Sequence, residues 1–483
     1  MTHQPGPDLR YGTPAARWTL AATVLGSGMA FLDGTVVNVA LPAIGRDLGT
    51  SFTGLQWTVN AYLVTLTALL LLGGSLGDRL GRRTVFVWGL GAFTVASVVC
   101  GFAPGSSTLI VARAVQGVGG ALLVPGSLAI IGSVFHPEDR GRAIGAWSGL
   151  AGVATSIGPF LGGWLVDAVS WRAVFFINVP LAAVAIVIAL RYVPDTRADE
   201  EGPVDVPGAV LATLGLAGVS YAAIEHDGIG ALVAGLVGGL ALLGFLLVEH
   251  RRAAPMMPLG LFRSRQFSGT NLTTLAVYAG LGGATFLVVI RLQASMGYSA
   301  LEAGAALVPL SVLLLLFSPA SGQLGQRIGP RIPLTIGPII AGAGVLWLGA
   351  IGPGDGYVTS VLPAVVVFGI GMTFVVAPLT AAVLASVDDQ MTGVASGVNN
   401  AVARLAGLLA VAALPGMAGI ATGASLAEDL AAGYSTALQI AAAVTAAGGV
   451  VGFLLVSSEG RRRAEPPSPA SLSGGPRGAS DVT

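Results

Sequence analysis

Two charged residues, Asp33 and Arg113, lie inside long apolar runs of this sequence. Asp33 stands in FLDGTVVNVALP, about 12 Å along a helix from Pro42, where the run ends. Arg113 stands in LIVARAVQGVGGALLVPGS. An ionisable group in such a run is costly to hold in a membrane, so it is a functional candidate by default. A carboxyl group in an apolar cavity can bind and release protons near neutral pH, which favours proton exchange.

Each of these two residues also has a purely structural interpretation. Asp33 could be a hydrogen-bonded carboxylate that orients the first apolar run. Arg113 could extend its long side chain to the outer membrane interface. An arginine that stays inside must instead contact a carboxylate, water or carbonyl oxygens. Both residues fall in the outer halves of their runs, and we predict that Asp33 exchanges protons.

The stretch GGSLGDRLGRR, residues 73–83, places three arginines and one aspartate between two apolar runs. Its glycines permit tight turns and close helix contacts, and its arginines mark one side of the membrane. Its carboxylate can accept hydrogen bonds from arginines or from a helix N-terminus. The simpler interpretation is a solvated basic loop that only sets topology. The candidate residues are Gly74, Gly77, Asp78, Arg79, Gly81, Arg82 and Arg83.

A related stretch, SGQLGQRIGPR, follows at residues 321–331. When Gly322 is aligned with Gly74, an offset of 248 residues, the two stretches share a leucine, three glycines and two arginines. Gln326 replaces Asp78, so the turn itself does not require the carboxylate. The pattern indicates two homologous halves, and it suggests a role for Asp78 that is specific to the first half.

A third motif, GAWSGLAGVATSIGPFLGG, combines small residues with a Gly-Pro pair. The proline interrupts the helical hydrogen-bond ladder and permits a bend. Spacing alone fits ordinary packing of small residues between helices equally well. The candidate residues for the bend are Gly145, Gly158, Pro159, Gly162 and Gly163.

Other polar residues in the apolar runs could line a cavity. Ser396, Asn400 and Arg404 recur every four residues and so share one face of a helix. Each of the remaining polar residues could equally make a single hydrogen bond between helices. These are Asn60, Tyr62, Gln116, Asn178 and Asn271. Glu225 and Asp227, at the end of another run, are expected to be solvated, with proton entry as a second interpretation.

The elements that must position these residues are membrane-spanning helices. The chain has 483 residues, 54% hydrophobic, with a mean hydropathy of +0.80, which excludes an ordinary soluble domain. A helical span needs about 20 apolar residues. Fourteen runs qualify: 17–41, 53–73, 84–103, 108–131, 141–165, 172–192, 207–225, 229–248, 269–291, 302–323, 332–351, 358–386, 393–420 and 435–457. We therefore predict an all-α polytopic membrane protein.

The offset between the two basic stretches predicts eight spans between them. Two adjacent six-span bundles would place only six spans there, so two extra spans are expected between the bundles. The expected divisions are a cytoplasmic segment at 1–16, a bundle at 17–192, a linker with two extra spans at 193–268, a second bundle at 269–457, and a disordered cytoplasmic tail at 458–483. With the N-terminus inside, most of the 24 basic residues, all arginines, fall on the cytoplasmic side.

Several classes of function are not indicated by this sequence. The formal net charge is zero, so nothing suggests a nucleic-acid partner. The single cysteine, Cys100, can form no internal disulfide. We find no metal-binding cluster, nucleotide loop or nucleophile triad, so we expect no catalytic residues, no metal and no cofactor.

Four motifs resemble those of the major facilitator superfamily. Residues 73–83 resemble its loop signature G-x-L-x-D-R-x-G-R-R, and RAVQGVG at 113–119 resembles R-x-x-Q-G-x-G of span 4. LDGTVVNVALP and the Gly-Pro motif resemble the span 1 and span 5 signatures of its fourteen-span drug:proton antiporter branch, of the EmrB/QacA type. Ala154 stands where that span 5 signature has a middle glycine.

The resemblance implies an antiporter in the bacterial cytoplasmic membrane that exports hydrophobic or amphipathic compounds in exchange for protons. It also implies that Asp33 carries the proton, that Arg113 tunes it, and that residues 74–83 form a conformational latch. We expect a monomer driven by the proton gradient. The alternatives are a dedicated exporter of one endogenous metabolite or self-made antibiotic, and a membrane sensor that transports nothing.

Overall fold

The computed structural model describes residues 9–197, 205–252, 255–388, 391–420 and 426–458. Half of the expected segment 1–16 and all of 458–483 except its first residue therefore lie outside the described residues. Within them, fourteen helical spans are long and apolar enough to cross a membrane, which confirms the predicted number. The first bundle contains α1 (Pro14–Leu48), α2 (Phe52–Leu80), α3 (Arg82–Gly101), α4 (Ser106–Val134), α5 (Pro137–Ala168), and α6 (Ala173–Phe176) with α7 (Asn178–Tyr192) as one span.

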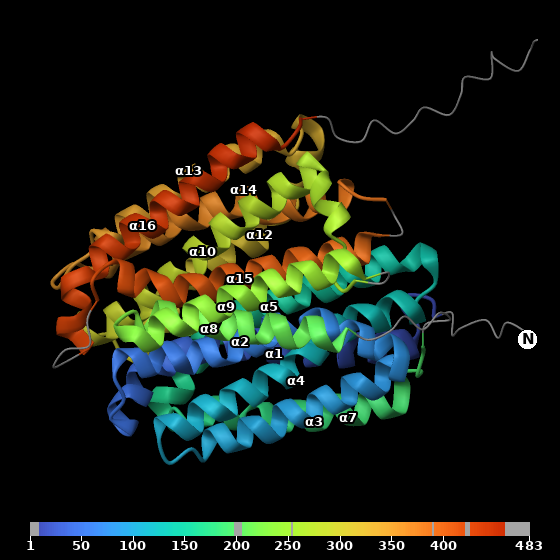
Figure 1. Cartoon of the computed structure of the whole chain (residues 1–483), viewed down its shortest axis with the longest axis horizontal. Helices are drawn as coiled ribbons and strands as arrows, with labels where there is room; N and C mark the ends of the chain where they lie inside the picture. Colours follow the sequence, from blue (N-terminus) through green and yellow to red (C-terminus); the bar gives the residue numbers. More distant parts are fainter. Residues whose placement is uncertain (1–8, 198–204, 253–254, 389–390, 421–425, 459–483) are drawn as a thin grey trace, which may run out of the picture.

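The second bundle repeats this arrangement after a helical hairpin. The hairpin consists of α8 (Val206–Glu225) and α9 (Gly228–Arg251). The second bundle contains α10 (Arg265–Ala294), α11 (Ala300–Ala306) with α12 (Val308–Ile328) as one span, α13 (Arg331–Gly349), α14 (Leu362–Ala385), α15 (Thr392–Met417) and α16 (Leu426–Leu455). In Figure 1 the first bundle, in blue and teal, lies below the second, in yellow to red.

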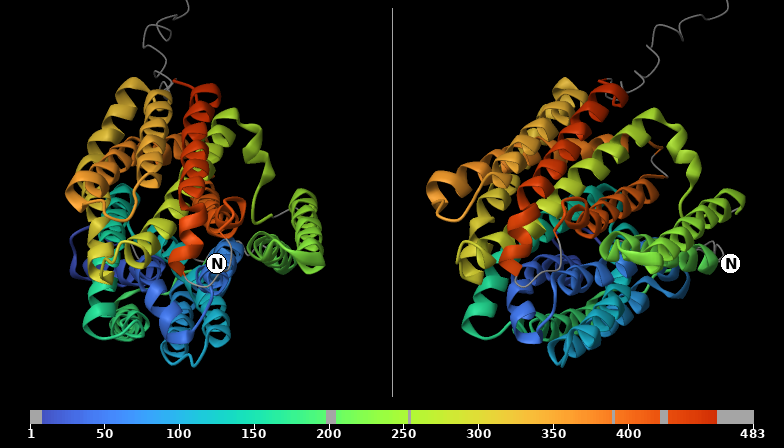
Figure 2. Two further views of the ribbon diagram at one scale, coloured as in Figure 1. Left: turned by 90° about the vertical axis from the view of Figure 1, so that its left-hand side faces the viewer. Right: turned by 60° about the vertical axis from the view of Figure 1, so that its left-hand side comes forward.

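The α8–α9 hairpin stands to one side of the two bundles (Figure 2). Its helix α8 packs against α2 of the first bundle and α15 of the second. Ala212 and Leu216 of α8 share an apolar cluster with Val64 of α2 and Leu408 of α15. The hairpin therefore covers a seam between the bundles, while α9 exposes most of its apolar surface, as a lipid-facing helix does.

Glu225, at the end of α8, is not a solvated carboxylate as the sequence suggested. It is half-buried, and its Oε1 accepts a hydrogen bond from Nε1 of Trp57 at 3.0 Å. The neighbouring Asp227 is exposed, as expected. The difference arises because α8 packs on α2, which brings a tryptophan donor to a carboxylate that sequence alone places at a helix end.

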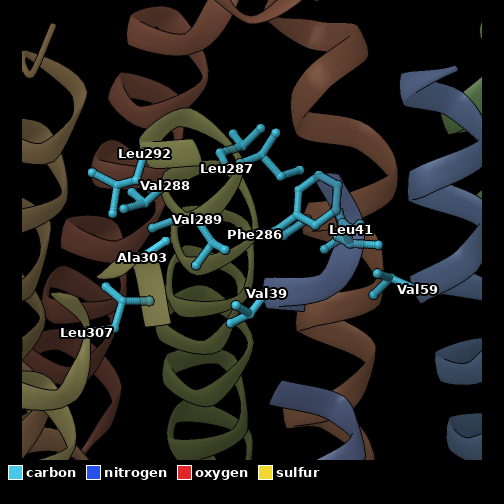
Figure 3. Close-up of a cluster of buried hydrophobic side chains, with 14 of the residues drawn as sticks. Val39, Leu41, Val59, Phe286, Leu287, Val288, Val289, Leu292, Ala303 and Leu307 are labelled. Atoms are coloured by element: carbon cyan, nitrogen blue, oxygen red, sulfur yellow. The ribbon is translucent and has the colours of Figure 1, made fainter. Parts of the chain in front are cut away.

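The two bundles meet most closely at the end away from the chain termini. We call the end that holds Pro14 and Leu455 the terminus side and the opposite end the far side. On the far side, Val39 and Leu41 of α1 pack with Phe286 of α10 in a buried apolar cluster (Figure 3). The side chain of Gln293 on α10 donates to the carbonyl of Val39 at 2.9 Å.

Two further contacts join the bundles on the far side. Gln56 of α2 donates to the carbonyl of Val411 on α15 at 2.8 Å. The carboxylate of Asp167 on α5 accepts hydrogen bonds from the backbone N–H groups of Ala300 and Leu301, at 3.2 and 2.8 Å. Because these two N–H groups belong to the first turn of α11, the carboxylate satisfies donors that a helix start leaves free. The far side is thus closed by apolar packing and by hydrogen bonds.

Toward the terminus side the bundles separate, and their helices diverge to the right in Figure 1. On α12, Leu316 and Phe317 are exposed. An apolar pocket of about 370 Å³ lies there between α12 and α14, with Phe317, Leu324 and Phe374 among its lining residues. This pocket lies within the second bundle, and Figure 1 shows the two bundles joined on the far side and diverging toward the terminus side.

Candidate functional site

The buried charge pair of the first bundle is formed by Asp33 of α1 and Arg113 of α4. Their side chains are 0% and 1% exposed, and Nη1 of Arg113 lies 2.5 Å from Oδ2 of Asp33. The pair forms because α4 can approach its neighbours closely: a Cβ on Gly117 would lie 2.4 Å from the carbonyl oxygen of Tyr62 on α2. The sequence predicted each residue as functional, and the structure brings the two into direct contact.

Two amide groups, one from α4 itself and one from α7, complete the surroundings of Asp33. Nε2 of Gln116 donates to Oδ1 of Asp33 at 2.8 Å and is also 2.8 Å from Oγ of Ser97 on α3. Nδ2 of Asn178, at the start of α7, is 3.5 Å from Oδ1 of Asp33 and 3.2 Å from Oγ of Ser97. All of these side chains are fully buried. The carboxylate is therefore held by one cation and by neutral donors in a water-excluded site.

The guanidinium of Arg113 is satisfied on several sides. Its Nε donates to the carbonyl of Thr58 at 3.1 Å, and its Nη1 donates to Oε1 of Gln116 at 2.7 Å. Its carbon lies 4.3 Å from the centre of the Tyr62 ring, a cation–π distance. A side chain bound in this way does not extend to the membrane interface, so the snorkelling interpretation of Arg113 is wrong.

The negative charge of Asp33 balances the buried charge of Arg113. A buried ion pair is balanced only while both partners are charged. Loss of the negative charge of Asp33 would leave Arg113 with a buried charge supported by a carbonyl, an amide and two aromatic rings. Because the residues come from α1, α2, α3, α4 and α7, a change at this site acts on the packing of most of the first bundle.

The basic stretch at residues 74–83, predicted as a loop, is almost wholly helical: it ends α2 and begins α3, with Gly81 between them. Gly81 ends α2 at φ +107°, a conformation that favours glycine, and a Cβ there would lie 2.7 Å from Asp195. Oδ1 of Asp78 accepts from Nε of Arg82 at 2.9 Å. The carboxylate of Asp195, beyond α7, accepts from the backbone N–H of Arg83 at 3.1 Å and the hydroxyl of Thr84 at 2.8 Å.

Asp195 was not singled out from the sequence. It follows a proline at the end of a span, and only the fold places it against a loop 112 residues earlier. Ser97, Thr58 and Gln56 were missed for the same reason, because each is an ordinary polar residue in an apolar run. In this state the ion pair of Asp78 is with Arg82, on its own loop.

The Gly-Pro motif of α5 lies where the bundles and helices approach most closely. A Cβ on Gly158 would lie 2.0 Å from Oγ1 of Thr35 on α1. A Cβ on Gly162 would lie 2.9 Å from Val36 on the same helix. A Cβ on Gly163 would lie 2.5 Å from the backbone of Leu301 on α11 in the other bundle. Gly145, by contrast, has nothing within 4 Å of such a Cβ. The motif thus serves close packing on the far side, with Pro159 inside a continuous helix.

The other polar candidates divide into buried packing residues and residues of α15 that are half-buried. Gln116, Asn178 and Tyr62 belong to the buried charge site and do not border an open cavity. Asn60 is buried with its carboxamide 3.3 Å from the backbone of Leu408 on α15. Asn271 is buried within the second bundle, where its oxygen accepts from another asparagine.

The polar stripe of α15, Ser396, Asn400 and Arg404, is half-buried along its length. The side chain of Asn400 donates to the carbonyl of Ser396 at 3.0 Å, within its own helix. Arg404 is different, because its guanidinium carbon lies 5.4 Å from the ring centre of Phe31 on α1, in the opposite bundle.

The fold and this site define a polytopic membrane protein in which two six-helix bundles face each other and the first bundle holds a buried charge pair. The sequence matches the Major Facilitator Superfamily over residues 23–411, and the chain belongs to that family. The resemblance to this superfamily that its motifs carry is thereby confirmed.

Named relatives match most of the chain. It is 36% identical over 427 residues to the tetracenomycin C resistance and export protein of Streptomyces glaucescens, covering 86% of this chain and 77% of the relative. It is 34% identical over 472 residues to a puromycin resistance protein of Streptomyces alboniger, covering 94% and 93%. Among solved structures, a bacterial homologue of the human lysosomal transporter Spinster, inward-facing and unoccupied, matches with a TM-score of 0.66 at 18% identity, covering 92% of this chain and 97% of that one.

Proposed function

We propose that this protein exports hydrophobic or amphipathic compounds across the bacterial cytoplasmic membrane in exchange for protons, by alternating access. The observation that carries the proposal is the buried contact between Asp33 and Arg113, a carboxyl group held against a permanently charged guanidinium inside the first bundle. The names of the relatives, which include resistance and export proteins, support the substrate class. One chain contains both bundles, so a monomer suffices, and the proton gradient replaces any cofactor.

The proposed orientation places both termini in the cytoplasm. Arginines gather on the terminus side, among them Arg82, Arg83, Arg140 and Arg327, and few lie on the far side. Such an excess is typical of cytoplasmic loops. The molecule would then be open to the cytoplasm and closed to the exterior, in the state that admits a compound from inside the cell.

Coupling follows from the charge pair. Proton binding to Asp33 unbalances Arg113 and so changes the relative stability of the two access states. Asp33 would take up the proton in the state open to the exterior and release it in the state open to the cytoplasm. The protein would carry the compound outward as it passes from the state open to the cytoplasm to the state open to the exterior. The compound itself would not react.

Reconstituted protein tests this proposal. Liposomes with an acidic lumen should accumulate a substrate against its gradient, and a protonophore should abolish that accumulation. The substrate is chosen by drug-susceptibility profiling of a pump-deficient bacterium that expresses the protein. No flux for any compound that the expressing strain resists would contradict transport and favour a sensor.

A dedicated exporter of one compound is the second candidate, because relatives are named for single antibiotics. The susceptibility panel separates the two. Resistance to one structural class supports the dedicated exporter, whereas resistance to several unrelated classes supports a multidrug transporter.

The basic loop gives a further prediction. Asp78→Asn should reduce transport far more than Gln326→Ala, because Asp78 binds Arg82 whereas Gln326 is an exposed side chain in the second copy of the loop. If Asp78 is part of a latch, loss of its charge shifts the population between the two access states. The measurements are efflux and accessibility labelling at equal expression, and equal effects of the two substitutions would refute a role specific to the first half.

A further inference from the structure

Arg404 is a cation in the middle of a membrane-spanning helix. It lies about 18 Å along α15 from Thr392, where the helix begins. Its guanidinium carbon is 5.4 Å from the ring centre of Phe31, so the side chain points across the boundary to the first bundle. It is nevertheless only half-buried. The side chain therefore lies at the boundary between the two bundles, at mid-membrane depth and partly accessible.

No carboxylate compensates this cation among the residues that the structure describes. Asp33, the carboxylate at a comparable depth, is engaged by Arg113 and by Gln116. The described acidic residues of the second bundle lie in first helical turns or connecting segments: Glu302, Asp355, Asp388, Glu428 and Asp429. The two mid-membrane arginines thus differ, since Arg113 has an ion pair and Arg404 has none in the described part of the chain.

One aromatic ring, Phe31, lies beside Arg404, and the buried Trp147 packs against that ring. The ring centre of Phe31 lies 6.4 Å from that of Trp147 on α5, and the two rings are tilted. Trp147 itself is held by a hydrogen bond from its Nε1 to Oγ of Ser27, at 3.3 Å. Aromatic faces bind flat ligand rings, and a guanidinium can donate two parallel hydrogen bonds to a carboxylate or another planar anion. A cation beside an aromatic ring is complementary to a ring system that carries a negative charge.

We propose that Arg404 binds the anionic group of the exported compound, so that the substrate class is aromatic organic anions. The proposal rests on the proposed function, because it assigns the substrate of the same transporter. An uncompensated guanidinium in a low-dielectric space is unfavourable when empty and is stabilised when an anion enters. The same cation repels positively charged compounds, which gives selectivity against cations.

The test is binding of a matched set of probes to purified full-length protein in nanodiscs, without a proton gradient. The probes are 9-anthracenecarboxylate, its neutral carboxamide and the cationic 9-anthracenemethylammonium, which share one ring system. Wild type should bind the carboxylate about tenfold or more tightly than the carboxamide, because a hydrogen bond between charged groups contributes at least that much. It should bind the cation most weakly.

Arg404→Gln should remove the preference for the carboxylate and leave affinity for the carboxamide within about twofold. Arg404→Lys should keep part of the preference, because lysine keeps the positive charge but does not form the two parallel hydrogen bonds of a guanidinium. The control is Arg263→Gln, which removes an exposed arginine outside the bundles and should change nothing. Because the guanidinium has no ion partner, Arg404→Gln should also leave Tm unchanged or higher.

Three results would overturn the assignment. The first is a wild-type protein that binds the three probes with equal affinity. The second is an Arg404→Gln variant that loses equal affinity for the carboxylate and the carboxamide. The third is a lowered Tm of that variant, which would indicate a structural role. The wild-type comparison needs no variant, so the test holds even where a substitution fails to fold. Charge-selective binding without pH-driven flux would contradict the proposed antiport and leave this inference standing.

Discussion

Asp33→Asn is expected to reduce uphill, pH-gradient-driven accumulation in proteoliposomes to the level of protein-free liposomes. Asparagine keeps the size of the side chain and its capacity for hydrogen bonds but does not exchange a proton at physiological pH. Without a titratable group at this position, protonation no longer changes the relative stability of the two access states. Downhill exchange of substrate is the most that the variant should retain.

The structure adds a cost that the sequence did not indicate. Asp33→Asn leaves Arg113 buried without its counter-ion, and breaking a buried pair costs about 3–5 kcal/mol. The single variant should therefore show a lowered Tm. The double variant Asp33→Asn/Arg113→Gln removes both charges and should recover stability without recovering coupling. This pair of variants separates a failure of coupling from a failure of folding.

A stable Asp33→Asn protein that accumulates substrate like the wild type would show that another group carries the proton. Glu225 and Asp227 would be the next residues to test. Arg113→Gln alone should also impair coupling, because it removes the cation that balances the carboxylate.

Gly163→Val is expected to shift the protein strongly toward the state that is open on the far side. A Cβ at this position would lie 2.5 Å from the backbone of Ala300 and Leu301 in the opposite bundle, and backbone atoms cannot move aside as a flexible side chain can. Overpacking of this kind costs about 1–3 kcal/mol. A cost confined to the closed state changes the ratio of the two states by roughly 5–150-fold.

Maleimide labelling of Leu41→Cys measures this shift, because Leu41 is buried in the far-side cluster. Labelling should be slow in the otherwise wild-type protein and fast with Gly163→Val. The sole native cysteine, Cys100, is buried, and Cys100→Ala serves as the background control. Gly145→Val is the matched substitution in the same motif and helix, where nothing lies within 4 Å of the added Cβ. Equal labelling of the two glycine variants would contradict the packing argument.

The amino-acid sequence by itself determined the class of fold. Apolar runs of sufficient length demand helices in a membrane, because a backbone in lipid must satisfy its own hydrogen bonds. The number of spans therefore follows from composition, and the repeated basic stretch separates the two bundles. The cost of a charge in such a run also marked Asp33 and Arg113 individually, without any knowledge of their neighbours.

The tertiary structure alone decided which residues meet. Asp33 and Arg113 are 80 positions apart, and Asn178 and Ser97 join them and Gln116 from other helices. Small residues at the helix surfaces allow these approaches, but hydropathy carries no information about which faces of the helices come together. The same holds for Asp167, whose partners lie in the other bundle, and for the contrast between a compensated Arg113 and an uncompensated Arg404. A charge is identified by its residue type, whereas its compensation depends on three-dimensional packing.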